Sequence, residues 1–223
     1  MSAVVLFDLD GTISDSAPGI LTALRHAFEV NGIPPLDAAT ERAILGPPFY
    51  TSLPPYIGGT EHLDDVIAAY RERYVGGGAM YDTRAYDGMP ELLRTLAASG
   101  VRLALATSKP EAYAVPIVEH LGVADCFETI GGDRLDGSLG TKALVVGEVL
   151  RRLGDPDPAT VRMVGDREHD ALGARAHGVD TIGVSWGYGL PGELAGAGVL
   201  TLCDTAAELA GALSVTPVRS RSA

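Results

Sequence analysis

Two carboxylates directly follow an apolar run near the start of the chain. Residues 4–7 are all apolar, and Asp8-Leu9-Asp10-Gly11-Thr12 comes next. A short, wholly apolar run is typical of a central parallel strand, and such sheets bind ligands beyond the carboxyl ends of their strands. Because Gly11 allows the backbone to turn, Asp8 and Asp10 could approach one cation or phosphoryl group from different directions. The alternative is an ordinary turn, since Asp and Gly are common turn residues.

A second apolar run, Met163-Val164-Gly165, also ends in acids. Asp166 follows it at once, and Asp170 comes four residues later, one turn away if the segment is helical. If the acids after these two strands meet, their negative charges repel one another unless a cation lies between them. Oxygen ligands without a His or Cys cluster favour Mg²⁺. We expect His169 to pack or cap a helix rather than bind the ion.

The chain has two lysines, Lys109 and Lys142, among its 17 basic residues. Lys109 follows Thr107 and Ser108 at the end of a third apolar run, and Lys142 begins a predicted helix. A compact positive charge at either place could bind a phosphate, helped at Lys142 by the helix N-terminus. The alternatives are a helix cap for Ser108 and a solvated side chain for either lysine, with Lys109 the more exposed of the two.

The order of predicted elements indicates an α/β protein with a helical insert. Helical patterns cover residues 18–28, 37–45 and 61–74, and no strand is predicted between residues 18 and 85. From residue 90 onward, helices alternate with strands over 102–107, 127–130, 161–164, 181–185 and 199–202. We therefore expect a Rossmann-like core with a parallel sheet and helices on both faces, formed by residues 1–14 and 86–215. Residues 15–85 would form a helical cap on two linkers, and residues 216–223 a disordered tail.

The composition limits the partners of the protein. The 223 residues carry a net charge of −12, which argues against nucleic acid polymers and anionic membranes as ligands. No apolar run reaches the ~18 residues of a membrane helix, and no basic segment precedes a signal-type core. We expect a cytoplasmic protein, in which a small anionic substrate would need local positive charge. Cys126 and Cys203 are expected to be buried free thiols.

Taken together and in this order, four motifs resemble the haloacid dehalogenase (HAD) superfamily of aspartyl-phosphate phosphotransferases. They are Asp8-Leu9-Asp10-Gly11-Thr12, Thr107, Lys142, and Gly165-Asp166 with Asp170. The helical insert resembles the C1 cap of that superfamily. The resemblance implies a Mg²⁺-dependent phosphatase that acts on a small phosphorylated metabolite as a monomer or dimer.

The roles that this resemblance implies are specific. Asp8 would attack phosphorus, and Asp10 would protonate the leaving oxygen and then deprotonate water. Asp8, the Asp10 carbonyl and Asp166 would hold Mg²⁺. Thr107 and Lys142 would hold phosphate oxygens. Asp170 would orient Lys142 or a metal-bound water.

Finer features resemble the phosphoglycolate phosphatase group and its 5'-nucleotidase-like branch. The first motif and the cap resemble the group as a whole. The branch is indicated by Leu45-Gly46-Pro47-Pro48, residues 165–170 and Trp186-Gly187-Tyr188-Gly189. Ala143 follows Lys142 where many glycolate-phosphate enzymes carry proline, which argues against glycolate. Two rivals remain: a mutase or protein kinase-like phosphotransferase that passes the phosphoryl group to another hydroxyl, and a non-catalytic binding module.

Candidate substrate contacts come from both parts of the chain. Six of the eight tyrosines fall in or beside the insert, and most are expected to form its core. We expect substrate contacts from Phe49, Tyr50 and Arg71 in the insert. In the core, the candidates are Gly11, Thr12, Ser108 and Lys109.

Overall fold

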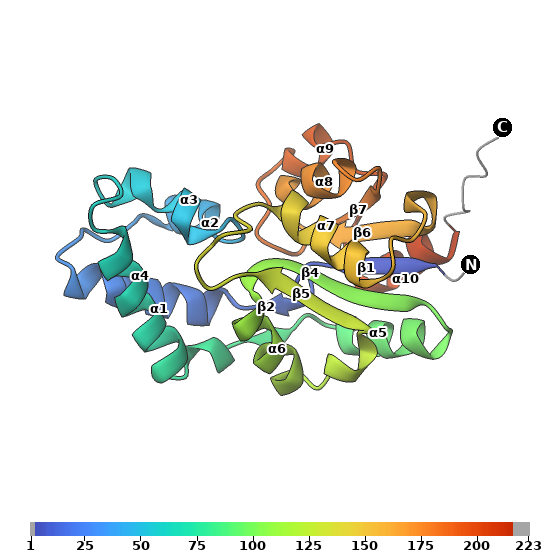
Figure 1. The fold of residues 1–223 in the computed structure, drawn as a ribbon, viewed down its shortest axis with the longest axis horizontal. Helices are drawn as coiled ribbons and strands as arrows, with labels where there is room; N and C mark the ends of the chain where they lie inside the picture. Colours follow the sequence, from blue (N-terminus) through green and yellow to red (C-terminus); the bar gives the residue numbers. More distant parts are fainter. Residues whose placement is uncertain (1–2, 216–223) are drawn as a thin grey trace.

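The computed structural model describes residues 3–215, and a parallel sheet forms the centre of this part of the chain (Figure 1). The strand order is β5-β4-β1-β6-β7-β8. These strands are β1 Val4–Phe7, β4 Arg102–Pro110, β5 Thr129–Asp133, β6 Val161–Gly165, β7 Asp180–Val184 and β8 Thr201–Cys203. Phe7 is in register with Leu105 of β4 and with Val164 of β6. The acids that follow β1 and β6 are therefore level with each other at one edge of the sheet.

Helices cover both faces of this sheet. The core helices are α5 Met89–Ala98, α6 Glu111–His120, α7 Lys142–Arg152, α8 Glu168–Arg175, α9 Glu193–Gly196 and α10 Ala206–Val215. Side chains of α5, α6 and α10 pack with Val5 and Phe7 on one face. Side chains of α7 and α8 pack with Val4 and Leu6 on the other. Because β1 is buried on both faces, it is apolar throughout rather than alternating.

A second group of helices lies beyond the carboxyl edge of the sheet (Figure 1). It comprises α1 Ala17–Val30, α2 Ala38–Ala43, α3 Phe49–Ser52 and α4 Leu63–Arg71. The apolar faces of α1 and α4 pack together through Leu24, Phe28 and Ile67. Single helical turns over Pro54–Tyr56, Glu72–Gly76 and Ala79–Tyr81 complete this insert, and turns over Ala124–Cys126 and Pro158–Thr160 belong to the core.

The insert is joined to the core through a short antiparallel ribbon. β2 (Ser14–Asp15) pairs with β3 (Arg84–Ala85), with Ser14 opposite Ala85 and Asp15 opposite Arg84. The expectation that residues 18–85 contain no strand is therefore wrong for Arg84 and Ala85. Two residues are too few to show an alternating pattern, and the pairing arises because the chain leaves and re-enters the core at one place.

Three other expectations from the sequence concern the cysteines, membrane-spanning helices and the C-terminal tail. Cys126 and Cys203 are free thiols, as expected, but Cys203 is buried and Cys126 is only half-buried, so the expectation of burial is wrong for Cys126. Within residues 3–215, none of the helices has both the length and the apolar character needed to cross a membrane. The tail expected over residues 216–223 lies outside the described residues.

Candidate active site

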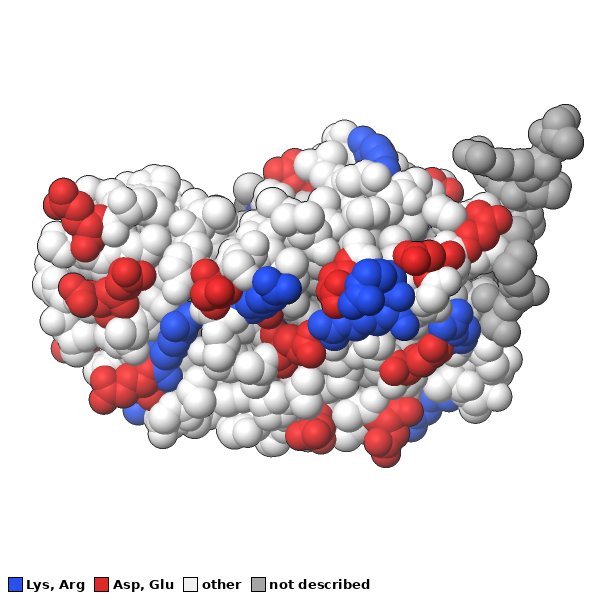
Figure 2. All heavy atoms as spheres, in the orientation of Figure 1, with Lys and Arg blue, Asp and Glu red and all other residues white. Residues whose placement is uncertain are grey.

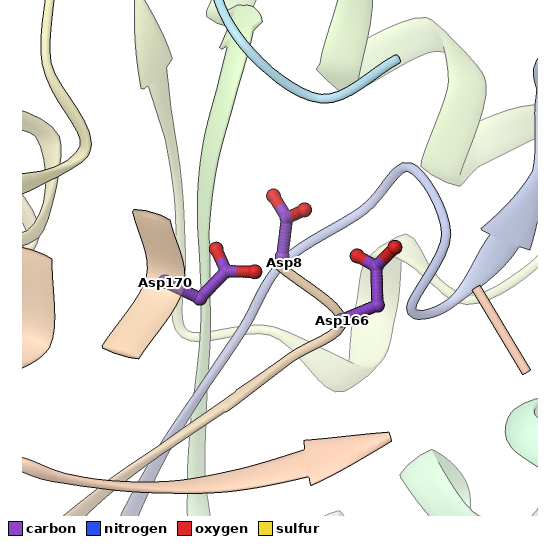
Figure 3. A group of neighbouring side chains, drawn as sticks. All are labelled: Asp8, Asp166 and Asp170. Atoms are coloured by element: carbon purple, nitrogen blue, oxygen red, sulfur yellow. The ribbon is translucent and has the colours of Figure 1, made fainter. Parts of the chain in front are cut away.

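Three buried carboxylates meet where β1 and β6 end (Figure 3). Asp8 follows β1, Asp166 follows β6, and Asp170 lies in the first turn of α8. Each offers an oxygen within 4.8 Å of the other two. The parallel register of β1 and β6 brings together acids that are more than 150 residues apart in the sequence.

Lys142 joins two of these carboxylates. Its Nζ lies 2.7 Å from Asp8 Oδ1 and 2.7 Å from Asp170 Oδ1, and it donates to the Ala106 carbonyl oxygen at 3.0 Å. The lysine is the first residue of α7, whose N-cap Thr141 accepts from Leu144 N. Burial by itself lowers the pKa of Lys142, but Asp170 and Asp8 together raise it above its usual value, so the amine stays charged. Lys142 is therefore not a solvated surface lysine.

Asp166 is enclosed by backbone and by a hydroxyl group. Thr12 Oγ1 donates to its Oδ1 at 3.2 Å, and the main-chain N of Tyr188 donates to its Oδ2 at 2.7 Å. A Cβ at Gly11 or Gly187 would lie 2.2 or 2.3 Å from Asp166 Oδ2, so both positions require glycine. Burial raises the pKa of Asp166 well above its usual value, and the charges of Asp170 and Asp8 add to this effect.

Asp170 has a partner for each of its oxygens. Besides the contact of Oδ1 with Lys142, its Oδ2 accepts from the main-chain N of Arg167 at 3.1 Å. Burial raises the pKa of Asp170 to about 6, although Lys142 lowers it. The carboxylate thus fixes both Lys142 and the turn that leads into α8.

Asp10 lies apart from these three acids and has partners of its own. Ser16 Oγ donates to Asp10 Oδ1 at 2.5 Å, and Lys109 Nζ lies 3.0 Å from Asp10 Oδ2. Asp8 and Asp10 therefore have different cations beside them. This separation allows the two carboxylates to perform different chemistry.

Lys109 is buried, so the expectation that it points to solvent is wrong. Besides its ion pair with Asp10, it donates to the Tyr74 hydroxyl at 2.8 Å and lies over the Tyr74 ring. Burial lowers the pKa of Lys109, but Asp10 and Tyr74 raise it above its usual value overall. The physical reason for the burial is that β4 continues to Pro110, which keeps Lys109 at the sheet edge under a tyrosine of the insert.

The two hydroxyls before Lys109 are also buried. Thr107 Oγ1 accepts from the main-chain N of Lys109 at 3.2 Å. Ser108 does not cap α6, whose N-cap residue is Pro110 in the described structure. Both hydroxyls lie at the edge of the sheet from which Asp8 projects.

A pocket extends from Asp10 into the space between the insert and the core. Phe49, Tyr50 and Arg71 line it from the insert, and Ser108 and Lys109 line it from the core. Apolar and aromatic side chains supply most of the remaining wall, among them Ile20, Leu45, Pro47, Tyr70, Tyr74 and Tyr113. Gly11 and Thr12 are not among the described residues that line this pocket. They lie against Asp166 instead.

Aromatic rings and one arginine shape the insert side of this pocket. The Tyr70 ring stacks on that of Tyr74 at a centroid distance of 5.0 Å, and Phe49 meets Tyr70 edge-on at 4.9 Å. Arg71 donates to the carbonyl oxygen of Leu135 in the core. The insert therefore rests on the core at the rim of the pocket.

Sequence analysis assigned no individual contact to three side chains near the site, Ser16, Arg167 and Tyr188. Arg167 Nε donates to Glu193 Oε1 at 2.7 Å, and its Nη1 donates to the Leu45 carbonyl oxygen in the insert. Tyr188 and Arg167 were noted only as parts of family-like motifs, without individual roles. Tyr188 lies between two glycines, which was an available signal, whereas Arg167 and Ser16 lie among other polar residues and had none.

Comparison with known proteins identifies the family of the chain. Residues 5–184 match the family model described as haloacid dehalogenase-like hydrolase. The chain therefore belongs to the haloacid dehalogenase-like hydrolase family, which confirms the resemblance seen in the four motifs.

Individual relatives carry different names. Tyrosine-protein kinase PtkA of Mycobacterium tuberculosis (strain ATCC 25618 / H37Rv) is 44% identical over 186 residues, which cover 83% of this chain and 63% of that protein. A 5'-nucleotidase of Pseudomonas aeruginosa is 38% identical over 194 residues, 85% of this chain and 86% of that protein. The crystal structure of a predicted phosphatase from Clostridium acetobutylicum has a TM-score of 0.89 at 34% identity, covering 96% of this chain and 99% of that chain.

Proposed function

We propose that the protein is a phosphatase that hydrolyses a small phosphomonoester through an aspartyl-phosphate on Asp8. The observation that carries this proposal is the pairing of the two carboxylates with different lysines: Asp8 with Lys142 and Asp10 with Lys109. One carboxylate can then act as nucleophile while the other, at the pocket, transfers protons.

The proposed reaction has two steps. In the first, an Asp8 oxygen forms a bond to phosphorus, the bond to the ester oxygen breaks, and Asp10 gives its proton to that oxygen. In the second, Asp10 takes a proton from water, the water oxygen bonds to phosphorus, and the bond to Asp8 breaks. Thr107 would hold a phosphoryl oxygen, and the Lys142 charge beside Asp8 would stabilise the negative charge of the transferring group.

The acidic cluster fits a bound Mg²⁺. Its donors are all carboxylate oxygens, they are buried, and Lys142 balances only part of their charge. Asp8, Asp166 and the main-chain carbonyl of Asp10 would hold the ion, and Asp170 would keep Lys142 in place through their ion pair. When bound, Mg²⁺ would neutralise the cluster and polarise a phosphoryl oxygen.

Residues 15–85 would serve as a cap domain on a core formed by residues 1–14 and 86–215. The β2–β3 ribbon would be its hinge, since it contains the two covalent connections between the parts. Acidic and basic side chains are interspersed on the face shown in Figure 2, which together with the net charge of −12 favours a small metabolite over a nucleic acid polymer or a membrane. We further propose a cytoplasmic location and a monomer or dimer.

Phosphate release from a panel of small phosphomonoesters tests this function. Activity should require Mg²⁺, disappear on treatment with EDTA, and return when Mg²⁺ is added in excess. The panel should include nucleoside monophosphates, sugar phosphates and phosphoglycolate. Full activity in metal-free buffer would contradict the proposed metal site, and a lack of activity on every ester would contradict the phosphatase.

The similarity to PtkA favours one second candidate, a phosphotransferase that passes the phosphoryl group to a protein hydroxyl. Product analysis in the presence of ATP and of protein or sugar acceptors separates the two functions. A hydrolase releases inorganic phosphate whether or not the acceptor is present, whereas a transferase gives a phosphorylated acceptor.

A further inference from the structure

The first helix of the insert begins without help from the side chain that would ordinarily cap it. Ser16 is the N-cap residue of α1, and a serine there usually accepts a hydrogen bond from a main-chain N–H two or three residues further on. In the described structure the Ser16 side chain makes no such bond, because its hydroxyl donates to Asp10. The N–H groups of Ser16 and Ala17, which the Ser16 side chain could not serve even as a cap, also need an acceptor.

Tyr188 provides that acceptor from the core. Its hydroxyl oxygen accepts from the main-chain N of Ser16 at 2.7 Å and from that of Ala17 at 2.9 Å. The same hydroxyl donates to Asp15 Oδ1 at 3.2 Å. One donated and two accepted bonds use the full capacity of a hydroxyl group. Tyr188 is buried, and 172 residues separate it from Ser16.

The main chain of Tyr188 has a separate contact with the acidic cluster. Its N–H donates to Asp166 Oδ2 at 2.7 Å, whereas the hydroxyl binds residues 15–17. A change of Tyr188 to Phe would keep the ring and the main-chain bond and remove only the hydroxyl. The two contacts can therefore be tested independently.

We propose that Tyr188 is a positioning residue for proton transfer by Asp10, acting through Ser16. By accepting from the N–H groups of Ser16 and Ala17, it holds the main chain at Ser16 in the position from which the serine hydroxyl reaches the Asp10 carboxylate. Without the tyrosine hydroxyl, these N–H groups lose their acceptor, the main chain at Ser16 shifts, and the serine hydroxyl moves away from Asp10. This inference rests on the proposed function.

The test uses the chemistry of the leaving group. Nitrophenolate leaves with little need for a proton, whereas an alkoxide must be protonated as it leaves. Tyr188→Phe should therefore lower kcat/KM on an alkyl phosphate by about tenfold or more, and lower that on p-nitrophenyl phosphate by about twofold or less. A merely structural defect would lower both values by the same factor, and equal losses or no loss would overturn the proposal.

A double-mutant cycle tests whether Tyr188 acts through Ser16. Ser16→Ala alone should show the same selective loss on the alkyl ester. Adding Tyr188→Phe to it should then cause little further loss, because the route through Ser16 has already been removed. Multiplying losses would mean that the two residues act independently, and would overturn the proposal. Tyr81→Phe, which removes an exposed hydroxyl from the insert, is the control and should leave both esters unaffected.

A second substitution covers the case in which Tyr188→Phe does not fold. Incorporation of 3-fluorotyrosine at position 188 keeps the hydroxyl but weakens it as an acceptor, so the alkyl ester should again lose more activity than the aryl ester. An unchanged ratio would overturn the proposal. If the wild-type protein releases no phosphate from either ester, the proposed function itself fails, which is a different result from an unchanged ratio in an active enzyme.

Discussion

Lys109 Nζ lies 3.0 Å from Asp10 Oδ2, and both groups are buried where the insert meets the core. The Tyr74 hydroxyl, which comes from the insert, accepts from the same amine at 2.8 Å. One lysine therefore links the carboxylate proposed to transfer protons with the segment proposed to close over it.

Because Lys109 is paired with Asp10, we expect both lysines to contribute to turnover. Lys142→Ala should lower kcat by about two to three orders of magnitude, because it removes the charge that lies beside both Asp8 and Asp170. Lys109→Ala should lower kcat by about tenfold or more, since it leaves the Asp10 carboxylate without its cation. Steady-state kinetics on one ester compare the two. A loss below about twofold for Lys109→Ala would contradict a functional role for its contact with Asp10.

Asp8→Asn should abolish turnover while leaving the fold intact. The substitution is nearly isosteric, but an amide cannot act as the nucleophile, so phosphate release should fall by at least about three orders of magnitude. Circular dichroism and a thermal melt provide the control for folding. Retained turnover in this variant would rule out an aspartyl-phosphate on Asp8.

Substrate selection should depend on the insert side of the pocket. Phe49→Ala and Arg71→Ala should change the order in which phosphomonoesters are preferred, because both side chains line the pocket that begins at Asp10. Turnover of p-nitrophenyl phosphate should change less, since the reacting groups remain in place. Arg73→Ala is the matched control, because Arg73 is exposed in the same segment. An unchanged preference in both pocket variants would place specificity in the core.

The pH dependence of stability should reveal the ion pair between Arg167 and Glu193. Burial tends to raise the pKa of Glu193, but hydrogen bonds from the main chain of Glu168 and Leu190 and from Arg167 lower it below its ordinary value of 4.5. A lowered pKa in the folded state stabilises the protein above the unfolded pKa, and this stabilisation is lost as the pH falls through the folded value.

Glu193→Gln should therefore destabilise the protein by about 1 to 2 kcal/mol at pH 7, because it removes one charge of a nearly buried pair. Thermal melts between pH 7 and pH 3 should show the difference in Tm between the two proteins shrinking below about pH 4.5. A difference that stays constant over this range would show that the ionisation of Glu193 contributes nothing to stability.

The sheet, the helical insert and the acids at the strand ends could all be predicted from the sequence. Runs such as residues 4–7 and 163–165 are local patterns without charged residues, and each is followed by an aspartate, which packing cannot bury without a partner. Because parallel strands align their carboxyl ends, the meeting of Asp8 with Asp166 followed from the strand assignments alone.

The partners of the buried polar groups could not be predicted, because they depend on packing between distant parts of the chain. Ser16 is the N-cap residue of α1, yet its hydroxyl binds Asp10, and its main-chain N–H donates to Tyr188, 172 residues away. Lys109 reads as exposed, yet the insert folds back and covers it with Tyr74. The physical reason is the same in both cases: a buried donor or acceptor must find a partner, and chain packing determines which group is near enough to serve.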